Sequence, residues 1–188
     1  MSIVSRNLRI AACAAIALAA PASARFPFAP PRSIVATEFP ARVLAEHNVA
    51  RREFGLMPLA WDPMLAQGAA SYAAQMAMTR VFAHSNRQGR PGIGENLWMG
   101  SRGRFTVEAM VDGWTSEKRY FVPGVFPNTS RTRNWSDVGH YTQMIWPTTT
   151  KVGCAIAGNG STDYLVCRYS PKGNVDGRPV PYVQLASR

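Results

Sequence analysis

The sequence has few cysteines and few histidines, and each scarcity excludes a class of protein. Three cysteines in 188 residues cannot build a scaffold held by several disulfides. The three histidines form no HExxH motif, so the local zinc-peptidase pattern is absent. No RNP, helix-turn-helix or zinc-finger signature occurs either, and we therefore expect no nucleic-acid partner.

Long apolar runs are also missing, apart from a short one at the N-terminus. Arg6 and Arg9 precede the run IAACAAIALAA, and small residues ending at Ala24 follow it, as in a secretory signal peptide cleaved there. The run is shorter than the roughly 20 residues that span a bilayer, so we expect no transmembrane segment in the mature chain. Residues 1–24 are assigned to the signal peptide, and the product is expected to be secreted, extracellular or periplasmic. Cys13 faintly resembles a lipoprotein cleavage site, which leaves lipidation as an alternative.

The rest of the chain has the length of one domain and contains no internal repeat. Four prolines predict an extended tail over residues 25–40, and a single domain follows over residues 41–188. Helical patterns come first and strand patterns follow, an order that favours an α+β sandwich. The expected elements are helices over 41–54, 61–78 (with Asp62 as N-cap and Pro63 next) and 106–119, a loop over 84–100, and strands over 139–146, 152–157 and 164–169.

Positive charge exceeds negative charge by a wide margin. The chain has 21 lysines and arginines against 11 acidic residues, and only two of the arginines lie in the predicted signal peptide. The basic residues are scattered along the chain rather than gathered on one helix face. Such a surface attracts anionic partners such as membrane surfaces, wall polymers or acidic substrates, although a soluble basic surface without a specific role is the alternative.

The two cysteines that remain after the signal peptide predict a disulfide. The β segments Val152–Ala157 and Tyr164–Tyr169 flank the turn-rich GNGSTD, which predicts a hairpin. If the loop is symmetric, Cys154 and Cys167 lie opposite each other, and opposed residues of an antiparallel pair come within disulfide reach. Two buried free thiols are the alternative.

An apolar stripe on the third predicted helix ends in an acidic residue. Glu117 is the next position of a stripe that has spacings of three and four and comprises Val107, Met110, Val111 and Trp114. A buried glutamate costs on the order of several kcal/mol unless it is paired, protonated or near a cation. Gly113 and Phe121, four residues away on either side, cannot pair with it. Either the helix end frays and releases Glu117 to water, or Glu117 belongs to a site.

Four further polar residues lie in apolar or constrained segments. Glu95 lies between glycines and an apolar pair in GIGENLW, where it is either a surface cap or directed inward. His84 follows a predicted helix end and is either a capping residue or part of a site. His140 lies in the strand-like GHYTQMIW, where it is either a satisfied core residue or directed into a site. His47, within the first helix, is interpreted as a packing residue.

Two long segments resemble the signatures of a known family. GHYTQMIWPTT and YLVCRYSPKGNV, in this order, resemble the first and second signatures of the CAP superfamily of cysteine-rich secretory, antigen 5 and pathogenesis-related proteins. Residues 47–77, FAHSN and GENLWMG resemble its first two helices and its loop, so the resemblance covers about residues 41–182. It implies a three-layer α-β-α sandwich with a central antiparallel sheet. It also implies a surface cleft that contains two histidines and two glutamates, here His84, Glu95, Glu117 and His140.

This resemblance and the chemistry of the four side chains imply a weak divalent-metal site. Neutral imidazoles suit Zn²⁺, so His84 and His140 are the expected ligands, and waters held by the glutamates complete an open site. Without a metal, two nearby carboxylates are expected to raise the pKa of one of them. The family repertoire adds sterol-like, lipid and other apolar ligands, and the basic surface adds anionic envelope ligands.

Three functions follow for a chain that we expect to be monomeric. The first is a secreted, non-catalytic binding module whose cleft takes a divalent cation and an apolar or anionic ligand. The alternative is a metal-dependent extracellular hydrolase, a peptidase or esterase, with Glu95 or Glu117 as general base, although a third zinc ligand and a Ser or Cys nucleophile motif are not evident. The third is an envelope-associated protein that acts through charge. The chain lacks the extra cysteines of the cysteine-rich members, so their channel-modulating roles are not implied.

Overall fold

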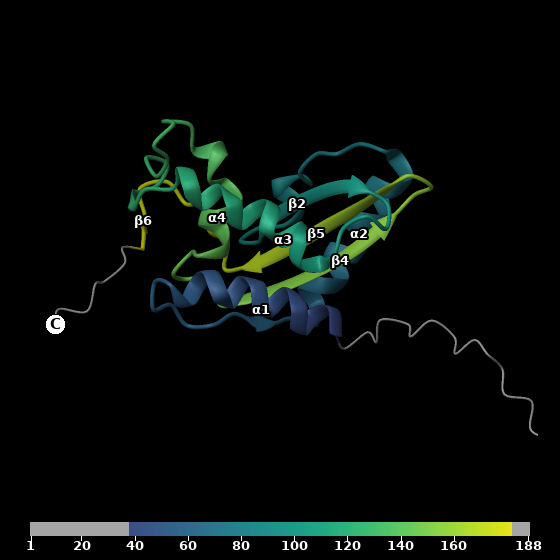
Figure 1. Cartoon of the computed structure of the whole chain (residues 1–188), viewed down its shortest axis with the longest axis horizontal. Helices are drawn as coiled ribbons and strands as arrows, with labels where there is room; N and C mark the ends of the chain where they lie inside the picture. The colour runs from purple at the N-terminus through teal and green to yellow at the C-terminus, as the bar shows by residue number, and fades with distance from the viewer. Residues whose placement is uncertain (1–37, 182–188) are drawn as a thin grey trace, which may run out of the picture. The chain divides into compact units, whose positions relative to one another are not determined.

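A four-stranded sheet with helices on both faces forms the centre of the domain (Figure 1). The computed structural model describes residues 38–181, so the predicted signal peptide, Cys13 and residues 25–37 of the predicted tail lie outside the described residues. Within residues 38–181, no helix is long and apolar enough to cross a membrane. The elements are α1 (Glu38–Arg52), β1 (Ala60–Trp61), α2 (Pro63–Thr79), β2 (Gly94–Ser101), α3 (Val107–Thr115), β3 (Gly124–Val125), α4 (Gly139–Met144), β4 (Lys151–Gly158), β5 (Thr162–Ser170) and β6 (Pro179–Val180), with the 3₁₀ turns η1 (Arg87–Gly89), η2 (Ser116–Tyr120) and η3 (Trp135–Asp137).

The main sheet has the strand order β1-β4-β5-β2, and β3 pairs with β6 separately. β4, β5 and β2 are antiparallel to one another, and the two-residue β1 adds a parallel edge to β4. The predicted hairpin is confirmed, and it places Cys154 directly opposite Cys167. These cysteines form the predicted disulfide, with Cα atoms 4.1 Å apart, so the alternative of two free thiols is wrong.

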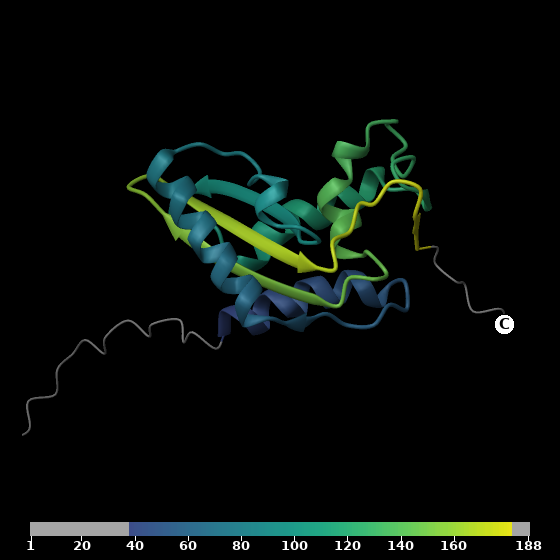
Figure 2. The same cartoon turned by 180° about the vertical axis from the view of Figure 1, so that it is seen from behind.

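The side chains of the central strand β5 alternate between two helical layers. Those that face α2 pack with Leu97 of β2 and are Tyr164 and Val166. Those that face the larger core, which includes residues of α1, α3 and α4, are Leu165, Cys167 and Tyr169. Figure 1 shows α1 and α3 on the near face of the sheet, and Figure 2, from behind, shows α2 crossing the other face. The chain therefore forms the α-β-α sandwich that the resemblance implies.

Helix α2 begins where local signals predict it. Asp62 is the N-cap, its carboxylate accepts hydrogen bonds from the backbone N–H groups of Met64 and Leu65, and Pro63 is the first helical residue. Gly153 of β4 lies against this first turn, and a Cβ atom there would clash with the helix backbone. The absent side chain therefore allows α2 to lie close to the sheet.

Two other helices differ from their predicted ranges of residues 41–54 and 106–119. α1 begins at Glu38 instead of residue 41, so residues 38–40 of the predicted tail are helical. Pro40 is tolerated there because the N–H groups of the first turn have no intrahelical acceptor. The helix predicted over residues 106–119 is α-helical only to Thr115 and continues as η2. Glu117 therefore lies just beyond the α-helix whose apolar stripe it seemed to extend.

The strand predicted over residues 139–146 is wrong, because residues 139–144 form helix α4. Aromatic and β-branched residues favour a strand locally, but distant side chains satisfy the ends of the helix. At the first end, Glu117 accepts hydrogen bonds from the backbone N–H groups of His140 and Tyr141. At the second end, the buried Arg51 donates to backbone carbonyl oxygens, which are those of Met144, Trp146 and Thr149. These tertiary hydrogen bonds outweigh the local preference.

The loop predicted over residues 84–100 is also partly wrong, because residues 94–101 form strand β2. The glycines of this segment predict irregular backbone, but two of them are needed for close packing. A Cβ atom at Gly94 would clash with the amide of Gln143, and one at Gly100 would clash with the ring of Trp98. Only the segment before residue 94 keeps the irregular path, and it carries His84.

Candidate functional site

Three of the four predicted cleft residues line a cavity of about 730 Å³. This cavity lies between the loop after α2, the start of β2, α4 and the segment that follows β5. His84, Glu95 and His140 reach it from the first three of these elements. Glu117 lines a second, smaller hollow of about 270 Å³ together with His140. The four side chains therefore lie around two hollows that share His140.

His84 and Glu95 form the first of two histidine–glutamate pairs. Oε1 of Glu95 lies 3.0 Å from Nδ1 of His84 and accepts a 2.9 Å hydrogen bond from the backbone N–H of Ser85. Oε2 accepts a 2.7 Å hydrogen bond from the Ser85 hydroxyl. The Glu95 side chain is fully buried, whereas that of His84 is 54% exposed. Glu95 on β2 thus holds the end of the loop and directs its imidazole.

Cations and hydrogen-bond donors around Glu95 keep it ionised. Burial raises the pKa of Glu95, but hydrogen bonds from His84 and Ser85 and the charge of Arg90 outweigh this effect and lower the pKa to about 2. Guanidinium nitrogens of Arg90 and Arg168 lie 3.7 and 3.6 Å from its oxygens. The expectation that carboxylate repulsion raises a glutamate pKa is therefore wrong for Glu95.

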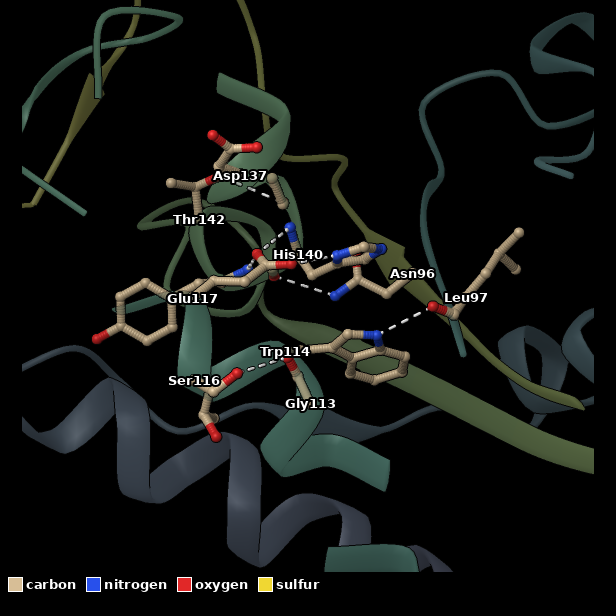
Figure 3. Close-up of polar contacts among 12 residues, drawn as sticks. Asn96, Leu97, Gly113, Trp114, Ser116, Glu117, Asp137, His140 and Thr142 are labelled. Atoms are coloured by element: carbon tan, nitrogen blue, oxygen red, sulfur yellow. Dashed lines mark hydrogen bonds and ion pairs between the residues drawn. The ribbon is translucent and has the colours of Figure 1, made fainter. Parts of the chain in front are cut away.

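His140 and Glu117 form the second pair (Figure 3). Oε1 of Glu117 lies 2.6 Å from Nδ1 of His140, and Oε2 accepts from the backbone N–H groups of His140 and Tyr141, each at 3.0 Å. Trp114 stacks on the imidazole, with ring centroids 6.0 Å apart and planes inclined by 16°, and its Nε1 donates to the carbonyl of Leu97. The alternative in which Glu117 swings to water is wrong, because only 17% of its side chain is exposed.

Both glutamates select the same tautomer of their histidine. An ionised carboxylate only accepts hydrogen bonds, so Nδ1 of each ring is the donor, and in the neutral ring Nε2 keeps its lone pair. A histidine whose N–H is held by a carboxylate is the usual arrangement behind a protein-bound metal. His84 and His140 therefore fit ligation through Nε2, and the glutamates fit as their hydrogen-bond partners.

The set of available metal ligands is small. Among residues 38–181, no cluster of three or more His, Cys, Asp or Glu side chains is arranged to hold a metal ion. The two imidazoles are 54% and 32% exposed and both line the cavity, so each offers an accessible nitrogen to it. Structural zinc sites use four protein ligands and catalytic ones generally use three. The residues present fit a loosely held divalent cation whose remaining positions are free for water or a ligand.

A buried chain of hydrogen bonds, which the sequence reasoning missed, supports His140. His47 donates from Nδ1 to the carbonyl of Val43, and its Nε2 accepts from the hydroxyl of Tyr169. Tyr169 accepts from the amide of Asn96, which also donates to the carbonyl of His140 at 3.0 Å. The packing role of His47 is confirmed by its complete burial, which also lowers its pKa to about 4. The available sequence signal was a polar Asn96 directly before the apolar pair Leu97 and Trp98.

The remaining cavity wall combines charged and apolar groups. Arg87 and Lys172 bring positive charge to it, and Asp176 brings one negative charge. Its apolar part contains Trp135, which is 43% exposed and packs edge-to-face on Phe126 with ring centroids 5.5 Å apart. A ligand that has an anionic group beside an apolar part is complementary to this wall.

Comparisons with known proteins place this chain in a known family. A family model described as CAP, the cysteine-rich secretory protein family, matches residues 44–169. Pathogenesis-related protein 1C of Nicotiana tabacum is 39% identical over 141 residues, which are 74% of this chain and 78% of that protein. Pathogenesis-related leaf protein 4 of Solanum lycopersicum is 37% identical over 149 residues, 78% of this chain and 87% of that protein. The solved structure titled "Crystal structure of NaASP2 with Zn2+" matches with a TM-score of 0.68 at 27% identity, covering 81% of this chain and 90% of that one.

Proposed function

The chain belongs to the CAP family of cysteine-rich secretory proteins, and we propose that it is an exported, non-catalytic binding protein with a divalent-cation site at His84 and His140. The observation that carries this proposal is the pair of Nδ1–carboxylate contacts, which leave Nε2 of both rings available. A solved relative was crystallised with Zn²⁺, which supports zinc as the cation. Bound there, the cation would supply a Lewis-acidic position for an anionic ligand group.

Export is the second part of the proposal. The N-terminal pattern that ends near Ala24, the description of the family as secretory, and the Cys154–Cys167 disulfide all support an oxidising compartment outside the cytosol.

The ligand class is the third part of the proposal. Arg87 and Lys172 on the cavity wall favour an anionic group, and the exposed ring of Trp135 favours an apolar or planar part beside it. This combination supports the anionic or apolar envelope ligand, lipid-like ones included, that the basic sequence and the resemblance suggest.

Hydrolysis is less well supported because it needs a free general base. Glu95, with a pKa of about 2, is a poor proton acceptor, and its oxygens already accept three hydrogen bonds. Both oxygens of Glu117 are also occupied, by the ring and backbone of His140 and by the backbone of Tyr141. If the wild type cleaves casein or an ester in a metal-dependent manner and folded His140→Ala does not, the hydrolase is the better description.

Calorimetric titration of the untagged protein with ZnCl₂ tests the cation site. We expect one weak site that His84→Ala and His140→Ala each abolish. Asp176→Asn, which removes a carboxylate from the same cavity without touching either histidine pair, is the matched control and is expected to bind as the wild type does. Zinc binding that survives both alanine variants, or that only the control abolishes, would show that the cation site is elsewhere.

A further inference from the structure

Strand β2 forms the floor of both hollows in succession. Residues 94–96 line the cavity, residues 97–99 line the smaller hollow, and His140 lines both. The smaller hollow, here called the groove, is bounded by the loop that carries Phe82 on one side and by Gly113, Trp114 and Glu117 on the other. A continuous track therefore runs along β2 from the cavity through the groove. At about 3.3 Å per residue, the eight residues 94–101 span roughly 25 Å.

The outer edge of β2 has backbone groups available for pairing at Met99. β2 is a terminal strand of the sheet, with β5 on its inner side. The carbonyl of Leu97 accepts from Trp114, which lies outside the sheet, so the backbone groups of Leu97 face outward. In an antiparallel ladder the N–H and C=O of one residue face the same side, and every second residue repeats this direction. Met99 therefore directs both groups to the outer edge, where no other segment of residues 38–181 forms a hydrogen bond with them, and the residue is 49% exposed.

The groups around this edge favour a peptide chain over a lipid or a small anion. An extended peptide offers N–H and C=O groups at the repeat of a strand, and side chains on alternate positions that enter neighbouring hollows. Exposed apolar side chains lie near this part of β2: Phe82, 44% exposed, lines the groove together with Met99, and Phe105, 46% exposed, packs edge-to-face on Trp98. They suit the apolar side chains of an added strand.

Basic side chains lie at both ends of the track. Arg87 and Lys172 line the cavity end, and the exposed Arg102 and Arg104 follow the last residue of β2 at the other end. The acidic residues on the track are Glu95, whose charge is balanced by Arg90 and Arg168, Glu117, whose oxygens are occupied, and Asp176 in the cavity. Antiparallel pairing of two copies at Met99 would bring Arg102 and Arg104 of one copy to the cavity end of the other, where Arg87 and Lys172 lie, so like charges disfavour a second copy.

We propose that the free edge of β2 binds an extended acidic peptide, about eight residues long, with apolar side chains in its middle and carboxylates at both ends. This inference rests on the proposed function, because it names the class of ligand that the cation-binding cavity takes. The peptide adds a strand to β2 at Met99, and its ends reach the two basic pairs of the track. One end lies beside His84 and His140, where a bound cation would attract its carboxylate.

Fluorescence anisotropy with a labelled synthetic peptide tests the proposal. The probe has two glutamates at each end and alternating valine and threonine between them, and the control probe has lysines in place of the glutamates. Met99→Pro removes the outward N–H and leaves the inward hydrogen bonds of the ladder in place, as proline does on edge strands. Met99→Leu is the matched control. We expect Met99→Pro to weaken binding roughly tenfold or more and Met99→Leu to change it less than about twofold.

A second arm tests the charges. Arg102→Gln/Arg104→Gln is expected to weaken binding and to reduce its salt dependence, whereas Arg52→Gln on α1 is the control and is expected to change neither. Should Met99→Pro fail to fold, hydrogen exchange of the Met99 amide in the wild type replaces it, and this exchange is expected to slow when the peptide is added. Equal binding by Met99→Pro and Met99→Leu, equal affinity for the lysine probe, or unchanged exchange at Met99 would refute the added strand. Binding of an acidic polysaccharide that Met99→Pro leaves intact would assign the track to a glycan instead.

The experiments distinguish a failure of the proposed cation site from a failure of the proposed peptide site. Loss of peptide binding in a protein that still titrates with ZnCl₂ refutes only the added strand. Peptide binding that persists in a protein without zinc binding refutes only the cation site, and His84→Ala is the variant of choice because His84 does not line the groove.

Discussion

The buried His47 makes the stability of the domain fall as the pH is lowered through the mildly acidic range. Its ring is completely buried between α1 and β5, where burial is the largest cause of its lowered pKa and the charge of Arg51 adds to it. The pKa is about 4 in the folded protein, against 6.5 for a free imidazole. The unfolded chain therefore binds a proton at this residue before the folded chain does.

The size of this change in stability follows from the linkage between proton binding and folding. Between pH 6.5 and pH 4 the unfolded state binds more protons than the folded state, so the free energy of unfolding rises with pH in this window. One pKa unit corresponds to about 1.4 kcal/mol, and the shift therefore amounts to about 3 kcal/mol. This stability is fully present above pH 6.5, is lost progressively down to pH 4, and does not change further below it because both states are then protonated. Glu95 acts in a different window, because its folded pKa of about 2 makes its contribution disappear only as the pH falls from 4.5 toward 2.

Urea unfolding followed by tryptophan fluorescence at several pH values from 4.5 to 7.5 measures this effect. His47→Gln keeps a donor and an acceptor but does not titrate, so the difference in pH slope between wild type and variant isolates His47. We expect the wild type to lose about 1 kcal/mol more per pH unit than the variant between pH 6 and pH 4.5. Parallel slopes would refute the reasoning. If His47→Gln does not fold, an NMR titration of the His47 ring in the wild type replaces it. A titration midpoint near 6.5 would contradict a buried neutral imidazole.

Three further perturbations test other parts of the structure. Arg51→Met leaves buried carbonyl oxygens without donors and is expected to lower the free energy of unfolding by about 3 kcal/mol, measured by urea unfolding; a loss below 1 kcal/mol would show that water replaces the guanidinium. Glu117→Gln keeps an acceptor for the start of α4 but no longer fixes the tautomer of His140, so calorimetry is expected to show zinc affinity reduced about tenfold; unchanged affinity would contradict the role of the carboxylate. Replacing Cys154 and Cys167 by serine is expected to cost about 3 kcal/mol, the entropic value for a short loop, and an unchanged urea midpoint would show that the ladder alone holds the hairpin.

The parts of the fold that the sequence predicts are those with local causes. Asp62 and Pro63 start α2 by capping and by a fixed φ angle, and the turn-rich GNGSTD sets the register that pairs Cys154 with Cys167. α4 could not be predicted in this way, because its ends are satisfied by Glu117 and Arg51 from other parts of the chain. Strand β2 could not be predicted from the sequence either, because its glycines are explained by side chains from the folded structure that leave no room for a Cβ atom.

The candidate site shows the same limit. Glu117 is conspicuous in the sequence because an apolar stripe ends in a carboxylate, but its partner, 23 residues away, follows from the tertiary structure alone. His84 and Glu95 are both visible as polar residues in constrained segments, and their contact depends on the path of the loop between them. The resemblance named all four residues, whereas the separation into two pairs and the resulting tautomer of His84 and His140 required coordinates.

The double use of Glu117 has a consequence for evolution. Because the same carboxylate caps a helix and orients a ring, selection for a folded protein alone would preserve it in descendants that no longer bind anything. Its presence in a homologous chain therefore says little about retained activity. His84 caps no helix and is more than half exposed at the end of a loop, so drift away from histidine there would be the earlier sign that a lineage had lost the proposed cation site.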